Sequence, residues 1–196
     1  MRAIWTRLAP GIAALALALA SGAANADCDV MTGGGFIINN GAKANFGVAG
    51  GCKGGSPTFG HLEYIDHGSG LNAHGTSITA YIFQASGFDS KGRPIGVRGI
   101  CGTARTNQPY GDVNFVVRAN DTGEPGTTDE FDIRLVKNGN IVYTTETCFH
   151  CWHKLNGGNG GGGNIQLHGP TAGNFSPLDP STCPANVPPP RRLKAD

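Results

Sequence analysis

The sequence predicts an all-β fold, namely a single antiparallel β-sandwich or barrel of about eight or nine strands that disulfides hold together. Three observations support this prediction. The chain has 32 glycines and 12 prolines, its apolar stretches are short and end at turn residues, and no apolar repeat of about 3.6 residues is long enough for a helix. A single domain of this length has enough residues to bury its own core.

Alternating apolar and polar residues locate the expected strands. Val113, Phe115 and Val117 share one face of an extended segment, because side chains two residues apart point to the same side of a strand. Asn138-Gly139 is a strong hairpin signal between two such segments. The expected strands cover residues 35–39, 44–49, 59–67, 77–84, 95–103, 112–118, 130–136, 140–145 and 164–168.

The N-terminal segment predicts export. Residues 9–20 form an apolar run that follows Arg2 and Arg7 and precedes the small-residue sequence Ala24-Asn25-Ala26. This pattern is typical of a secretory signal peptide, here residues 1–26. The run is shorter than the roughly 20 residues that a membrane-spanning helix needs. We therefore expect a secreted or periplasmic protein whose mature form has no membrane span.

The charge balance disfavours a nucleic-acid partner. Loss of residues 1–26 removes two of the 15 basic residues and none of the 14 acidic ones, which leaves a formal charge of −1. Nucleic acids and anionic membranes attract proteins through an excess of positive charge. The mature chain lacks that excess, so we expect its partner to be another envelope or extracellular component.

All six cysteines lie in the predicted exported part. An even number of cysteines in an oxidising compartment favours disulfides, although six cysteines allow 15 pairings and the sequence does not choose among them. A β-domain is expected over residues 27–169, followed by a proline-rich tail over residues 170–196 that Cys183 pins back to the domain. The disulfide candidates are Cys28, Cys52, Cys101, Cys148, Cys151 and Cys183.

Four segments resemble a known family when they are taken in order. They are MTGGGFI, GHLEYIDHGSGLNAHGTSIT, RANDTGEPGTTDEFDIRL and GGGNIQLH, and together they extend over residues 31–168. Their order resembles that of secreted bacterial β-domains of the post-choice-of-anchor type, which recur as modules beside cell-surface anchors. The resemblance implies an exported all-β module and assigns it no chemistry. The segment CFHCWH (residues 148–153) and the cysteine-bearing tail depart from the family pattern.

The segment CFHCWH admits several interpretations. A c-type haem site needs histidine directly after the second cysteine, and Trp152 occupies that position. A thioredoxin-like redox pair needs a thiol activated at a helix N-terminus, whereas the flanking sequence resembles a strand on one side and is glycine-rich on the other. We favour a disulfide staple, in which His150 and His153 are surface turn residues and Trp152 packs on the sheet. A metal site is the alternative.

Metal-ligating residues gather in two parts of the sequence. His61, Glu63 and His67 fall on one face of an expected strand, and His74 follows shortly after. Histidine and cysteine are suitable ligands for zinc or copper. The candidate ligands of both parts are His61, Glu63, His67, His74, Cys148, His150, Cys151 and His153.

Other chemistry has weaker support in the sequence. Asp121, Glu124 and Asp129 could offer oxygen ligands to calcium from a glycine-rich loop, but their spacing does not match an EF-hand and we favour an ordinary turn. The glycine-rich stretches lack the lysine of a phosphate loop and are expected to serve close packing or a bulge. Residues 157–164 are expected to be a flexible connection.

These observations identify no catalytic set, and HGSG at residues 67–70 does not match the nucleophile elbow of hydrolases. We therefore predict a non-catalytic binding or structural module at the cell envelope or outside the cell. The alternative is a periplasmic zinc- or copper-binding protein. Its ligands would be His61, His67, His74, His150 and His153, with Cys148 and Cys151 as further candidates.

Overall fold

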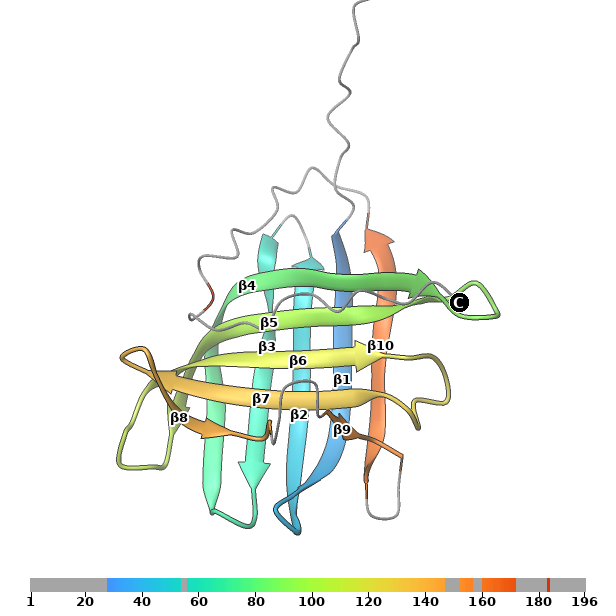
Figure 1. The fold of residues 1–196 in the computed structure, drawn as a ribbon. Helices are drawn as coiled ribbons and strands as arrows, with labels where there is room; N and C mark the ends of the chain where they lie inside the picture. The colour runs from blue at the N-terminus through green and yellow to red at the C-terminus, as the bar shows by residue number, and fades with distance from the viewer. Residues whose placement is uncertain (1–27, 54–55, 147–151, 157–159, 172–182, 184–196) are drawn as a thin grey trace, which may run out of the picture.

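The computed structural model describes residues 28–53, 56–146, 152–156, 160–171 and 183, and these form an all-β protein. The strands lie in one antiparallel sheet in the order β10-β1-β2-β3-β4-β5-β6-β7-β8, with β9 paired to β7 (Figure 1). Their bounds are β1 Cys28–Asn39, β2 Ala42–Lys53, β3 Ser56–Asp66, β4 Leu71–Phe88, β5 Pro94–Thr106, β6 Val113–Asp121, β7 Glu130–Lys137, β8 Asn140–Thr144, β9 His153–Lys154 and β10 Gly161–Thr171. None of the described residues belongs to a helix that is long and apolar enough to cross a membrane.

The sheet curls at β4, which is 18 residues long. The first four residues of β4 pair with β3, and the register with β5 begins at Ala73 and continues as far as Phe88, which lies opposite Pro94. The β4–β5 ladder has three register shifts, and such bulges bend a strand and increase its twist. The strands β5 to β8 therefore cross over β10, β1, β2 and β3 as a second layer (Figure 1), and the predicted antiparallel sandwich or barrel is confirmed.

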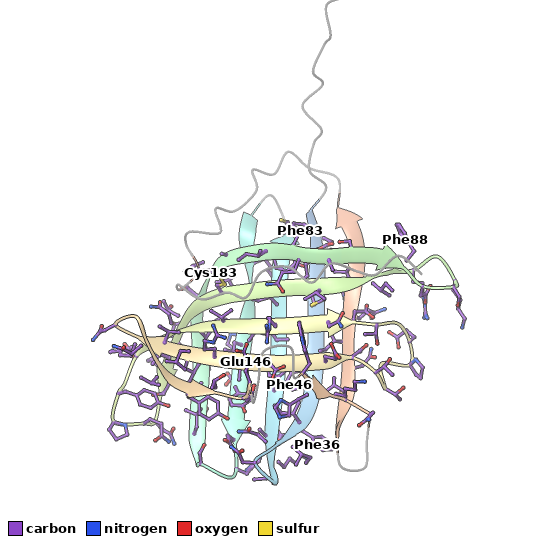
Figure 2. All side chains as sticks on the ribbon, viewed as in Figure 1. Phe36, Phe46, Phe83, Phe88, Glu146 and Cys183 are labelled. Atoms are coloured by element: carbon purple, nitrogen blue, oxygen red, sulfur yellow. A yellow bond between two sulfur atoms is a disulfide. The ribbon has the colours of Figure 1, made fainter. Side chains whose placement is uncertain are left out.

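The apolar core lies between these two layers. Phe46 of β2 stacks on Phe131 of β7 with 3.9 Å between ring centroids, and Figure 2 shows Phe46 where the layers overlap. Tyr64 of β3, the direct partner of Phe46 across the sheet, also stacks on Phe131, with 6.2 Å between ring centroids. Burial of a large apolar side chain contributes about 1.5–3 kcal/mol. These contacts between β2, β3 and β7 therefore hold the layers together.

The glycine-rich segments form the ladder between β1 and β10, where the two backbones approach closely. Gly35 lies opposite Gly163, and a Cβ atom at Gly35 would lie 2.1 Å from the carbonyl oxygen of Gly162. Gly163 itself has a φ of +129°, a conformation that favours glycine. The structure thus confirms that these glycines serve close packing.

All nine expected strands correspond to observed strands, although several ends differ. β4 begins at Leu71, before the expected start at residue 77, because its first residues pair with β3. The short strand β9 was not expected, since only its pairing with β7 defines it. The expectation of a flexible connection over 157–164 is wrong from Gly161 onward, where β10 begins, and residues 157–159 lie outside the described residues.

Cys101 of β5 forms a disulfide with Cys183, with 5.5 Å between their Cα atoms. This confirms that Cys183 pins the tail back to the β-domain. Cys52 is also disulfide-bonded. Cys148, Cys151 and the side chain of Cys28 lie outside the described residues, as does the predicted signal peptide.

A buried ion pair joins the start of β1 to the second layer. The Arg98 side chain, which is 1% exposed, contacts the carboxylate of Asp29 on β1. The Tyr81 hydroxyl donates a hydrogen bond of 2.7 Å to Asp29, and Arg98 also donates to the carbonyl oxygen of Ala85 at 2.6 Å. A buried charge is tolerated when it is paired and hydrogen-bonded in this way, so we interpret this cluster as structural.

Candidate metal centre

The alternation of β3 places two of the predicted ligands on its outer face. Leu62 and Tyr64 are fully buried in the core, so His61 and Glu63 point away from the core. Glu63 lies directly opposite His74 of β4. Side chains opposite one another in an antiparallel pair point to the same face, and the β3–β4 hairpin therefore brings the three side chains together.

The three side chains converge on one carboxylate oxygen. Nε2 of His61 lies 3.1 Å from Oε1 of Glu63, and Nδ1 of His74 contacts the same oxygen. One ligand atom from each residue lies within 4.8 Å of the other two. Zinc binds nitrogen and oxygen at about 2.0–2.2 Å, so the ligand atoms of one ion lie about 3–4 Å apart. The cluster is therefore close to the size that a single ion requires.

The cluster is open to solvent on its outer side. The side chains of His61 and His74 are each 51% exposed and that of Glu63 is 45% exposed. The carboxylate between the two imidazoles provides the negative charge that a cation needs. Three protein ligands leave a position of a tetrahedral ion for water or another donor. An ion bound there would thus be accessible to a second molecule.

His67 lies on the same face of the sheet but outside the cluster. Its Nε2 is 2.9 Å from Oδ1 of Asn45 on β2, so it faces the neighbouring strand on the side away from β4. The structure therefore groups His61, Glu63 and His74 and leaves His67 apart. Among the residues that the structure describes, no other set of His, Cys, Asp or Glu has metal-binding spacing.

The second predicted group is described only at its end. Cys148, His150 and Cys151 lie outside the described residues. His153 is not the surface turn residue we expected, because it lies in β9 with its side chain 15% exposed and Nδ1 2.8 Å from Oδ1 of buried Asp132. The structure places His153 in the second layer, apart from the β3–β4 cluster.

Trp152 packs on the second layer, as the staple interpretation expects. The guanidinium carbon of Arg118 on β6 lies 4.4 Å from the centre of the Trp152 ring. A cation over an indole face is an attractive arrangement.

The acidic loop uses its carboxylates to hold the edge strand β10. Asp129, which is fully buried, accepts a hydrogen bond of 2.8 Å from the backbone N–H of Ile165. Asp121 accepts one of 2.7 Å from the N–H of Leu167. Burial raises the pKa of both carboxyl groups, and the backbone donors counter that effect in part. These contacts agree with the turn that we favoured over a calcium site.

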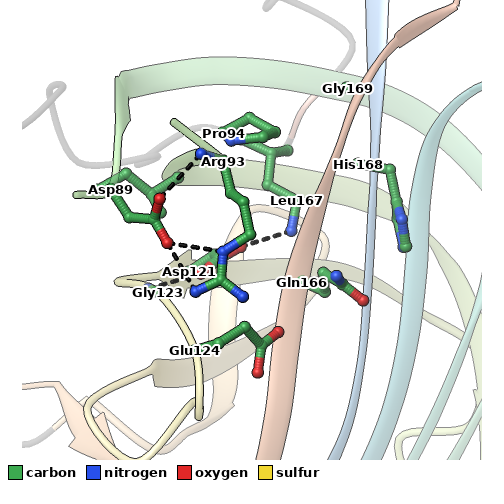
Figure 3. Close-up of a pocket in the computed structure, with 11 residues that line it drawn as sticks. Asp89, Arg93, Pro94, Asp121, Gly123, Glu124, Gln166, Leu167, His168 and Gly169 are labelled. Carbon is green, nitrogen blue, oxygen red and sulfur yellow. Dashed lines mark hydrogen bonds and ion pairs between the residues drawn. The ribbon is translucent and has the colours of Figure 1, made fainter. Parts of the chain in front are cut away.

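A cavity of about 200 Å³ lies beside this loop (Figure 3). The charged side chains that line it are already paired with each other or with neighbours. Arg93 forms an ion pair of 2.7 Å with Asp89, and Glu124 accepts a hydrogen bond of 3.2 Å from Asn164. Glu124 thus bonds to a side chain of β10, whereas Asp121 and Asp129 bond to backbone N–H groups of the same strand.

A polar network links the two layers near the β3–β4 turn. The hydroxyl group of Tyr143 on β8 donates a hydrogen bond of 2.8 Å to Asp66 and lies 2.7 Å from the hydroxyl of Tyr64. Burial raises the pKa of both tyrosines. Burial also tends to raise the pKa of Asp66, but the hydrogen bonds it accepts bring the net pKa below 3.8.

Sequence reasoning missed Arg105, which is opposite His74 in the β4–β5 register. Both residues line a shallow hollow together with Asn72, Thr106 and Asn107. Arg105 is 31 positions from His74 in the sequence, and the ladder between them contains bulges. No local pattern could therefore have placed the two side chains together.

No family model, curated protein or solved structure matches the chain. The fold and the outer-face cluster therefore carry the functional interpretation.

Proposed function

We propose that the protein is a non-catalytic binding domain that acts at the cell envelope or outside the cell, and that it binds a divalent transition-metal ion at His61, Glu63 and His74. The observation that carries this proposal is the placement of one ligand atom from each residue within 4.8 Å of the others. Two imidazole nitrogens and one carboxylate oxygen suit zinc and copper(II).

Two observations support action outside the cytoplasm. The Cys101–Cys183 disulfide is of a kind that persists in oxidising compartments and is rare in the cytosol. The N-terminal pattern of a charged segment, an apolar run and a small-residue site is that of an exported precursor. The resemblance to post-choice-of-anchor domains agrees with both.

The position of the cluster favours binding over catalysis. Catalytic metal ions act in dry, shaped cavities that exclude water and orient a substrate. The side chains of His61 and His74 are instead half exposed on the outer face of a sheet. An ion in such an exposed position is better suited to bridge the domain to another molecule than to activate a substrate for reaction.

Isothermal titration of zinc chloride into the metal-free mature protein tests the proposal. We expect one ion per chain and a loss of affinity of at least about tenfold in the His61→Ala/His74→Ala double variant. His67→Ala is the matched control, because His67 lies on the same face and outside the cluster, and it should retain wild-type affinity.

Unchanged affinity in the double variant would refute the proposed site. Loss of binding in Cys148→Ser/Cys151→Ser, with retention in the double histidine variant, would move the site to the CFHCWH segment. Circular dichroism of each variant would establish that the fold is intact before the titrations are compared.

A further inference from the structure

Arg105 differs from the other described arginines in its partners. Four of the five arginines within the described residues form ion pairs with carboxylates, namely Arg93 with Asp89, Arg98 with Asp29, and Arg118 and Arg134 with Glu146. Arg105 forms no ion pair with any residue that the structure describes, and it is exposed. Its guanidinium group is thus accessible to an anion from solution.

The sheet register places Arg105 beside the metal cluster. Glu63, His74 and Arg105 are successive partners across β3, β4 and β5, so they form one row on the outer face. Directly opposite residues of an antiparallel pair have Cβ atoms about 4.5–5.5 Å apart. Arg105 is therefore the direct neighbour of His74 on the side opposite Glu63, and both residues line the same hollow.

The hollow between His74 and Arg105 has a fixed polar wall. Oδ1 of Asn107 accepts a hydrogen bond of 2.8 Å from the backbone N–H of Asn72. The Nδ2 group of Asn107 donates one of 2.8 Å to the carbonyl oxygen of Gly70. These two bonds hold the Asn107 side chain against the β3–β4 turn, while the side chain of Asn72 is exposed beside His74.

We propose that this hollow binds a carboxylate group, with one oxygen on the open position of the metal ion and the other on the guanidinium group of Arg105. This inference rests on the proposed function, since the ion supplies half of the contact. A three-ligand zinc site accepts an oxygen donor in its open position. Arginine presents a planar fork of N–H donors that matches the geometry of a carboxylate. The metal and Arg105 together thus form a two-point site for a carboxylate.

Carboxylates of this kind occur both on small acids and on acidic saccharides, and two probes separate these sources. Acetate carries the carboxylate alone, whereas trigalacturonate adds hydroxyl groups that the exposed amide of Asn72 can bind. Titration of each probe into zinc-loaded wild-type protein should give binding by at least one. Binding by both indicates recognition of the carboxylate itself, and binding by trigalacturonate alone indicates an acidic saccharide.

Arg105→Ala should lower the affinity for the probe by at least about tenfold while the affinity for zinc stays within about twofold. Removal of zinc with a chelator should lower probe affinity by a similar factor. Lys91→Ala removes an exposed positive charge from a distant turn and should change neither affinity. Arg105→Lys should restore only part of the affinity, because lysine lacks the planar fork.

The two proposals fail in different ways. If zinc does not bind the wild-type protein, the proposed function itself fails. If zinc binds and neither probe does, or if Arg105→Ala binds the probe as tightly as the wild type, only the carboxylate site is refuted.

Discussion

Glu63 of β3 and His74 of β4 are direct partners across the sheet, and Oε1 of Glu63 contacts Nδ1 of His74. The same oxygen lies 3.1 Å from Nε2 of His61. The carboxylate is therefore the centre of the cluster, and its charge would offset that of a cation bound between the two imidazoles.

Glu63→Gln tests the contribution of this charge. The amide keeps the shape of the side chain and removes its negative charge, so the affinity for zinc should fall by at least about tenfold, because the loss of even an outer-shell partner of a metal ligand typically has that effect. The stability of the metal-free protein should change by about 1 kcal/mol or less, because the pair is half exposed. Zinc titration and thermal unfolding measure the two effects. Wild-type zinc affinity in this variant would exclude Glu63 as a ligand.

The Asp66 network predicts a loss of stability in acid. The hydrogen bonds from Tyr143, Ser69 and Gly68 favour the ionised carboxylate and hold the pKa of Asp66 in the folded protein below its ordinary value of 3.8. A carboxyl group whose pKa is lowered on folding stabilises the protein fully above the unfolded pKa. This contribution is lost as the pH falls below 3.8 and through the lower folded pKa.

Tyr143→Phe removes one of these donors, so we expect a loss of about 1–3 kcal/mol at pH 7 and a smaller loss at about pH 3. The smaller loss in acid follows because the wild type has itself lost part of the contribution there. Urea unfolding at both pH values provides the free energies. Tyr110→Phe is the control, because Tyr110 packs at the edge of the core and none of the described side-chain hydrogen bonds involves its hydroxyl. An equal loss from Tyr143→Phe at both pH values would contradict the assigned role of Asp66.

The fold was predictable because apolar and polar residues alternate clearly along its strands. In β3, Leu62 and Tyr64 are fully buried while His61 and Ile65 are exposed, and this period of two is visible in the sequence. The first part of β4 was missed because its polar residues and Gly75 resemble a loop. β9 was missed because two residues carry no periodicity, and their pairing with β7 depends on the folded chain.

The candidate site was predictable only within one strand. The spacing of His61 and Glu63 places them on one face, but the position of His74 depends on the register of the β3–β4 hairpin, in which Asp66 lies opposite Leu71. Recognition of residues 67–70 as a four-residue turn would have fixed that register, since the pairing follows from the turn length. The position of Arg105 beside His74 could not be predicted, because bulges shift the β4–β5 register.

Gly35 of β1 and Gly47 of β2 lie in the same layer, but their substitution by alanine should have different effects on stability. A Cβ atom at Gly35 would lie 2.1 Å from a carbonyl oxygen of β10, whereas one at Gly47 meets nothing within 4 Å. Gly35→Ala should therefore lower the free energy of unfolding by about 1–3 kcal/mol, the usual cost of overpacking. Gly47→Ala should leave it unchanged or raise it by up to about 1 kcal/mol, because alanine restricts the unfolded chain. Chemical denaturation of both variants measures these changes, and equal effects would show that the two backbones can move apart.

The buried carboxylate of Asp129 predicts a local effect at the edge of the sheet. Its two oxygens accept hydrogen bonds from the N–H groups of Thr122 and Ile165. In Asp129→Asn, one oxygen becomes an NH₂ donor, so one of these N–H groups loses its acceptor. Burial raises the pKa of Asp129, so removal of the charge also relieves a desolvation cost. The global free energy of unfolding therefore combines opposing changes.

Hydrogen exchange at the Ile165 amide separates the local effect from the global one. Hydrogen bonds to charged groups contribute about 1.5–3 kcal/mol, so exchange of this amide in Asp129→Asn should be at least about tenfold faster than in the wild type, provided that the amide oxygen faces Thr122. If it faces Ile165 instead, the faster exchange will appear at the Thr122 amide. Asp112→Asn is the control, because Asp112 is exposed and only its backbone carbonyl oxygen accepts a hydrogen bond, from Lys137. Wild-type exchange at both amides would show that Asp129 does not hold β10 to the loop between β6 and β7.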